Sequence, residues 1–86
     1  MPSLKKILLD AREMEHPIPL QLALNHLQAM KKNEYLYMLH RKKPIPLIEV
    51  AIEKEFAHFT HQDKEENWHI LISKEKSSNL KELLNV

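Results

Sequence analysis

The stretch that decides the fold is HPIPLQLALNHL, residues 16–27. A proline in the first turn of a helix removes no internal hydrogen bond and has a φ angle already suited to helix, so Pro19 predicts a helix start. Pro17 biases the residue before it toward extended backbone. After Pro19 the apolar residues repeat on one helical face, and these are Leu20, Ala23, Leu24, Leu27 and Met30. The stretch therefore predicts an extended segment that turns into a helix.

The motif Pro-Ile-Pro-Leu occurs again at residues 44–47. Pro44 and Pro46 predict a second helix by the same mechanism, from about residue 46 to residue 55. We expect this helix to bury Leu47, Ile48, Ala51 and Ile52 and to expose Glu49, Glu53 and Lys54. We interpret the repeat as a local signal that marks two strand-to-helix turns, in preference to an internal duplication.

Four short segments have the composition of strands, namely residues 7–9, 35–40, 56–61 and 68–73, and the last two flank a polar segment as in an antiparallel hairpin. A right-handed crossover makes the first two strands parallel. The sequence therefore predicts an α+β fold, a two-layer β-α-β-α-β-β sandwich whose four-stranded mixed sheet carries both helices on one face. Residues 1–75 form this domain. Residues 76–86 form a tail, in which Asn79 and Glu82 favour a short docked helix.

The composition excludes several functions. A chain of 86 residues supports one core, and a formal net charge of +1 gives no global field for nucleic acid or anionic lipid. No segment is apolar enough to cross a membrane, and no cleavable leader is visible, so we expect a cytoplasmic location. The absence of cysteine excludes disulfides and thiolate chemistry, and the absence of glycine excludes a glycine-rich phosphate loop. No nucleophile-base pair is visible, so enzymatic activity is the least favoured class and no cofactor is indicated.

In the predicted topology both proline turns lie at the carboxyl ends of the first two strands, where α/β sheets commonly bind ligands. Basic side chains beside helix N-termini suit a phosphate or a carboxylate. The first hypothesis is therefore a binding module for a small anionic ligand. Its ligand-binding residues are His16, His40, Arg41, Arg12 and Lys43, with Lys42 nearby. A basic turn that is merely solvated is the simpler alternative.

A metal site is the second hypothesis, because His16 and His40 could share an ion if the two turns converge. Asp10 with Glu13 or Glu15 would have to complete the ligand set. The other histidines are expected on solvent-facing sides of their elements, and these are His26, His58, His61 and His69.

The third hypothesis is a protein-interaction domain. With both helices on one face, the other face of the sheet lacks a cover. This open face carries either Tyr35, Tyr37 and Leu39 or Leu36, Met38 and His40, because side chains alternate along a strand. A homodimer through the open face, a partner protein, or the leucines of the C-terminal tail would bury it.

Two segments resemble a known family. Asp10, five further residues and then His16-Pro17-Ile18-Pro19-Leu20 resemble the TusA-like (SirA-like) sulfur-carrier pattern, in which Cys-Pro-x-Pro opens the first helix. The segment His40-Arg41-Lys42-Lys43-Pro44-Ile45-Pro46-Leu47 resembles the Arg-x-x-Pro-x-Pro-Leu motif of a cysteine-lacking branch of that superfamily, whose function is unknown. The resemblance extends from about Ile7 to Ser73 and implies the same fold.

The resemblance also has a chemical limit. His16 stands where the family has its sulfur-accepting cysteine, and Glu13 replaces a glycine of the usual turn. An imidazole cannot hold a persulfide, so the resemblance implies the fold and the position of a site without the sulfur transfer.

Overall fold

A computed structural model describes residues 4–84, so residues 1–3 of the predicted domain and 85–86 of the predicted tail lie outside the described residues. The elements are β1 (Lys5–Asp10), α1 (Ile18–Ala29), β2 (Glu34–His40), α2 (Ile45–Glu53), β3 (Ala57–Gln62), β4 (Trp68–Ser73) and α3 (Leu80–Leu84). Their order confirms the predicted sequence of strands and helices.

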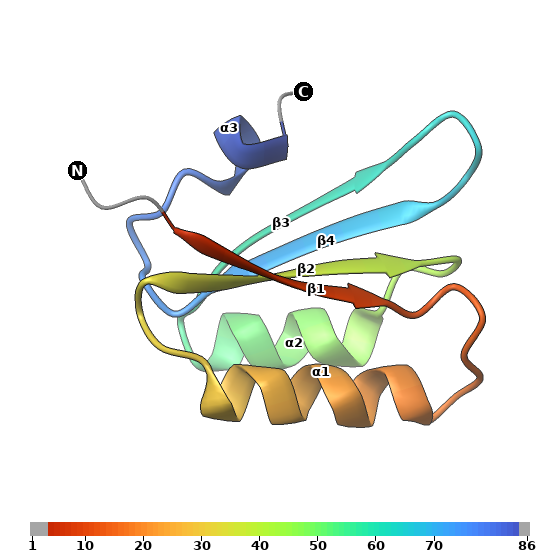
Figure 1. Ribbon diagram of the computed structural model, residues 1–86, viewed down its shortest axis with the longest axis horizontal. Helices are drawn as coiled ribbons and strands as arrows, with labels where there is room; N and C mark the ends of the chain where they lie inside the picture. The colour runs from red at the N-terminus through yellow and green to blue at the C-terminus, as the bar shows by residue number, and fades with distance from the viewer. Residues whose placement is uncertain (1–3, 85–86) are drawn as a thin grey trace.

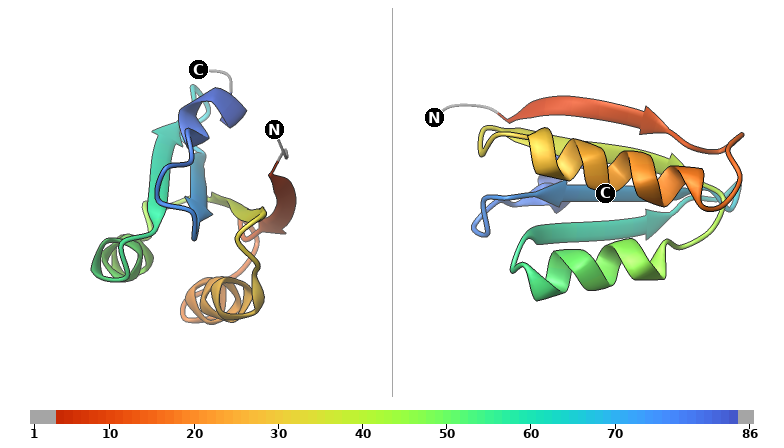
Figure 2. Two further views of the ribbon diagram at one scale, coloured as in Figure 1. Left: turned by 90° about the vertical axis from the view of Figure 1, so that its left-hand side faces the viewer. Right: turned by 90° about the horizontal axis from the view of Figure 1, so that it is seen from below.

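The strands form one mixed sheet in the order β1-β2-β4-β3. β1 pairs in parallel with β2, and β4 runs antiparallel to both of its neighbours, β2 and β3. α1 and α2 lie side by side against one face of the sheet, and α3 lies against the other (Figures 1 and 2). The predicted two-layer α+β sandwich is confirmed.

The prolines begin both long helices, as predicted. Pro17 and Pro44 are the N-cap residues, and Pro19 and Pro46 lie in the first turns. Since the chain contains no glycine, the end of α2 needs another residue in the left-handed conformation. Glu55 adopts it with φ 59°, and the backbone N–H of Phe56 then donates to the carbonyl of Ala51 at 2.8 Å.

The main core lies between the sheet and the two long helices. The sheet contributes Leu9, Leu36, Met38, Ile70 and Ile72, and the helices contribute Ala23, Leu27, Leu47 and Ala51. Two residues of α2 that were expected in the core lie outside it, because Ile48 is half-buried and Ile52 is 58% exposed. Leu47 and Ala51 form the buried stripe of α2 and face the sheet. Ile52 lies about 100° further around the helix and faces solvent.

The open face of the sheet carries Tyr35 and Tyr37, which settles which of the two alternating sets of β2 faces away from the helices. Tyr35 packs with Leu71 of β4 and with Leu80 of α3 in a second, smaller apolar cluster. α3 covers only the end of this face that lies near the start of β1, as Figure 1 shows. The rest of the face is partly open to solvent.

Candidate functional site

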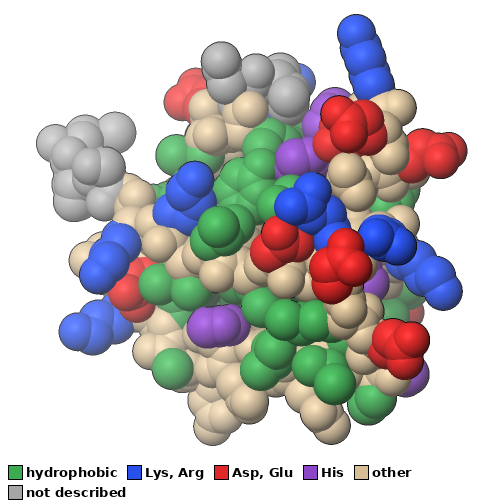
Figure 3. All heavy atoms as spheres, turned by 45° about the vertical axis from the view of Figure 1, so that its right-hand side comes forward, with side chains coloured by type: hydrophobic (Ala, Val, Ile, Leu, Met, Phe, Trp, Pro, Cys, Tyr) green, Lys and Arg blue, Asp and Glu red, His purple; other side chains and the backbone are tan. Residues whose placement is uncertain are grey.

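The candidate site is a cleft of about 770 Å³ at the end of the sheet where α1 and α2 begin. Residues of both proline turns line it. β1 and β2 end on the side of the molecule where α1 and α2 begin (Figure 1). The structure brings the predicted ligand-binding residues together, since Arg12, His16, His40, Arg41 and Lys43 all line the cleft. Of the four motif prolines, Pro19, Pro44 and Pro46 line it, whereas Pro17 stands at the N-cap of α1 outside the lining. Viewed from this side, the surface interleaves cationic, acidic and histidine side chains (Figure 3).

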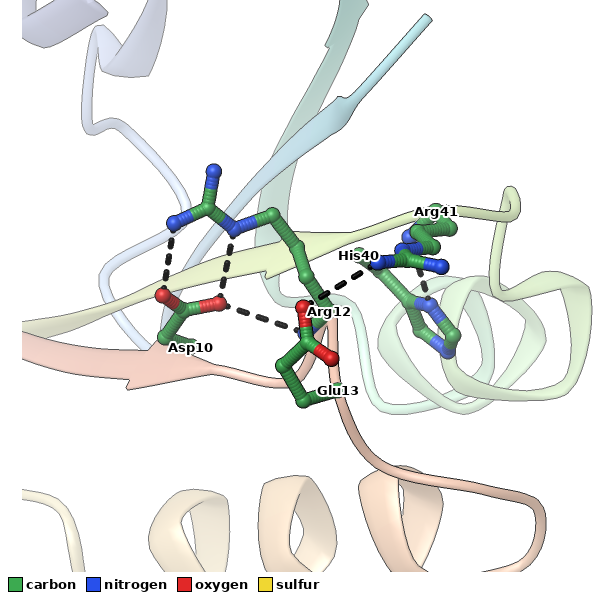
Figure 4. Close-up of polar contacts among 5 residues, drawn as sticks. All are labelled: Asp10, Arg12, Glu13, His40 and Arg41. Atoms are coloured by element: carbon green, nitrogen blue, oxygen red, sulfur yellow. Dashed lines mark hydrogen bonds and ion pairs between the residues drawn. The ribbon is translucent and has the colours of Figure 1, made fainter.

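Arg12 already has a carboxylate partner. Its Nε and Nη2 donate to the two oxygens of Asp10 at 2.9 and 2.8 Å (Figure 4). The side-chain hydrogen bonds from Arg12, followed by a bond from its backbone N–H, lower the pKa of Asp10 to about 2. This two-point pair holds the guanidinium beside Asp10, on the side of the sheet away from α1 and α2 (Figure 4).

Arg41 is held more weakly. Its Nη2 lies 3.1 Å from Oε1 of Glu13, and the two side chains are 65% and 88% exposed. An ion pair as exposed as this contributes on the order of 0–1 kcal/mol. The guanidinium of Arg41 can therefore exchange Glu13 for another anion at little cost, which Arg12 cannot do as easily.

The imidazole ring of His40 has a defined tautomer. The backbone N–H groups of Arg41 and Lys42 both donate to its Nδ1, at 2.8 and 3.3 Å. Nδ1 is therefore the unprotonated nitrogen, and Nε2 carries the hydrogen. Burial, and then the charge of Lys42, lower the pKa of His40 below its ordinary value. At neutral pH this side chain offers a neutral N–H donor.

Two lysines, Lys42 and Lys43, also line the cleft. Nζ of Lys43 lies 5.4 Å from the ring centre of Trp68, a cation–π contact that orients the lysine.

The helix starts offer fewer free N–H groups than the sequence suggests. Ile18 donates to the carbonyl of Glu15 and Ile45 to that of Lys43, and each proline lacks a donor. In the first turns of α1 and α2, Leu20 and Leu47 are the residues whose N–H finds no acceptor within residues 4–84, and both line the cleft.

The metal hypothesis gains no support from this geometry. His16 and His40 both line the cleft, but residues 4–84 contain no group of three His, Asp or Glu side chains arranged to hold an ion. In the same range, none of the helices has the length and apolar character that crossing a bilayer requires.

A second polar cluster, on the open face, was missed by sequence reasoning. The hydroxyl of Tyr37 lies 2.7 Å from Nδ1 of His69, and Nε2 of His69 lies 2.9 Å from Oδ2 of Asp63. His69 lies on the open face of the sheet, as expected, but its side chain is only 19% exposed because both ring nitrogens have hydrogen-bond partners. Hydrogen bonding from His69 is the largest cause of a lowered pKa at Asp63. The alternation of side chains along a strand predicts only that each of Tyr37 and His69 lies on one face of its own strand. The pairing of β2 with β4 is what brings the two side chains together.

The fold and the cleft define a small α+β protein whose polar residues gather where its two long helices begin. The chain belongs to the DUF2249 family of uncharacterised conserved proteins, whose sequence profile matches residues 8–74. That range contains both proline motifs and every residue of the candidate site. No curated protein and no solved structure shows significant similarity to the chain.

Proposed function

We propose that this protein is a non-catalytic module that binds a small anion, a carboxylate or a phosphate, in the cleft between its two proline turns. The observation that carries the proposal is a single cleft that is lined by four cationic residues and two acidic residues. The cations are Arg12, Arg41, Lys42 and Lys43, and the carboxylates are Glu13 and Glu15. The proposal includes a distant relationship to the TusA-like sulfur carriers, without persulfide chemistry because the chain has no cysteine.

The binding step is an exchange of partners at Arg41. An incoming anion replaces the exposed carboxylate of Glu13 and accepts charge-assisted hydrogen bonds from the guanidinium. Lys43 adds a second positive charge, and His40 supplies a neutral N–H donor from Nε2. The free N–H groups of Leu20 and Leu47 lie at the positive ends of two helices, which also favours an anion.

Calorimetric titration with inorganic phosphate and with acetate tests the proposal, at low ionic strength because salt screens such contacts. We expect R41Q to weaken binding about tenfold, since a lost hydrogen bond to a charged group has about this effect. E13Q should strengthen binding, because Arg41 then has no competing carboxylate. Failure to bind either anion at low salt contradicts the proposal.

Two control variants separate a specific contact from a change in net charge. K81Q and E82Q repeat the same charge changes on α3, which lies on the other face of the sheet (Figure 1). Both should leave the affinity for phosphate unchanged. If K81Q weakens binding as much as R41Q does, the cleft is not the site. The cytoplasmic location expected from the sequence belongs to the same proposal, and fractionation of expressing cells tests it.

A further inference from the structure

The outer edge of β1 has unpaired backbone groups. β1 is the last strand of the sheet, and nothing within residues 4–84 pairs with its outer side. The N–H groups of Lys5 and Ala11 donate to carbonyls of Asn33 and Leu39, both at 2.8 Å, so the odd-numbered residues of β1 face β2. Because successive residues alternate, the N–H and C=O groups of the even-numbered residues point outward. Figure 2 shows this edge uncovered at the side of the molecule.

The same even-numbered residues carry a charge pattern that complements itself. They are Lys6, Leu8 and Asp10, and their side chains lie on the open face. A parallel copy of β1 would place lysine against lysine and aspartate against aspartate. An antiparallel copy centred on Leu8 instead places Lys6 opposite Asp10 on both sides of a two-fold axis. Shifting that register by two residues pairs Leu8 with a charged residue.

We propose that the outer edge of β1 is a dimer interface that pairs antiparallel with β1 of a second copy of this chain, with Leu8 on the two-fold axis. In this register the outward N–H and C=O groups of all three residues find partners. Leu8 is 59% exposed, and in this register it meets its own copy. Asp10 keeps its bonds to Arg12, because a carboxylate accepts about four hydrogen bonds.

α1 extends the same surface. Leu20 and Leu24 lie on the side of α1 that faces α2, because they line the clefts between the two helices. Helical spacing places Ile18, Leu22 and His26 on the opposite side, next to the edge of β1. Ile18 is 48% exposed and Leu22 is half-buried. In the antiparallel dimer this apolar flank meets its copy beneath a continuous sheet, so strand pairing is not the only contact.

The dimer inference does not depend on the proposed anion site, and it has its own experiment. Sedimentation equilibrium of the wild-type chain should give twice the chain mass. K6D and D10K each place like charges opposite one another, and each should raise the dimer dissociation constant at least about tenfold. An equimolar mixture of K6D and D10K restores opposite charges at both ends of the pairing and should recover the dimer. K5D is the matched control, because Lys5 lies on the helix side of β1, and it should remain dimeric.

D10K also removes the partner of Arg12, so a second pair of variants guards against misfolding. L8K and L8D alter an exposed side chain, and each should be monomeric alone and dimeric when mixed. Circular dichroism confirms that every variant is folded. A wild-type chain that stays monomeric at millimolar concentration overturns the inference. Variants that remain dimeric alone, or mixtures of folded variants that fail to associate, also overturn it.

Discussion

The two faces of the sheet are built from the same four strands and differ in what covers them. The helix side is covered by α1 and α2, and its strand residues in the core are apolar and buried. Among the described residues 4–84, the five-residue α3 covers part of the open side. There the strands carry Tyr37 and His69 beside apolar residues, and their polar atoms are joined by hydrogen bonds. Full cover permits a purely apolar face, whereas partial cover favours side chains that pack and hydrogen-bond at once.

The largest predicted effect is on the helix side. Met38 is fully buried between the sheet and the helices. We expect M38A to lower the free energy of unfolding by about 3 kcal/mol, because it leaves a cavity in the core as well as losing apolar contacts. Chemical denaturation measures this loss. A loss below about 1 kcal/mol would show that the helix side is loosely packed and would remove the contrast between the faces.

A smaller effect is expected where α3 covers the open face. Leu80 is 3% exposed and packs against Tyr35 and Leu71. L80A should cost about 2 kcal/mol, because a short helix at the edge of the molecule can move to close part of the cavity. Hydrogen exchange should show faster exchange in α3 and unchanged protection in β2. L83A is the control, since Leu83 is 41% exposed, and it should have little effect.

The hydrogen-bonded part of the open face is expected to contribute less. Y37F removes the hydroxyl that contacts Nδ1 of His69 and should lower stability by about 1 kcal/mol. Y35F removes the same atom from a tyrosine whose hydroxyl has no hydrogen bond among residues 4–84, so it should be nearly neutral. Thermal and chemical denaturation of the two variants measure the difference. Equal losses would mean that the contact to His69 adds nothing.

The smallest effect depends on pH. The hydrogen bond from His69 leads the causes that hold the pKa of Asp63 below its ordinary value of 3.8. A carboxylate with a lowered pKa in the folded state stabilises the fold above 3.8, and this contribution is lost as the pH falls below that value. D63N should therefore be less stable than wild type at pH 7, and the gap should narrow between pH 4 and pH 2. A constant gap would show that the charge of Asp63 is not involved.

Much of the fold could be predicted because its signals are local. Pro19 and Pro46 fix helix starts by the geometry of a single residue, and the structure places both in first turns. The hairpin of β3 and β4 was predicted from two runs around a polar segment. The prediction that Ile52 is buried was wrong, because a nine-residue helix has too few turns to fix the centre of its buried stripe.

The residues of the candidate site could be predicted from the sequence, but the contacts among their side chains could not. Arg12 and Arg41 looked alike in the sequence, yet one has a two-point partner and the other an exposed, exchangeable one. The hydrogen position on His40 depends on how the following turn folds back over the ring. These are distances of a few ångströms across the turns, and no spacing along the chain encodes them.

The sequence by itself determined the order of the elements, the starts of both long helices and the end of the sheet where the polar residues gather, because periodicity and proline geometry act over a few residues. Only the tertiary structure decided which alternating set of β2 faces the helices and which acidic group pairs with which arginine. It also decided that Tyr37, His69 and Asp63 meet. The physical reason is that side-chain contacts between strands depend on register, and register is set by packing the whole sheet against its helices.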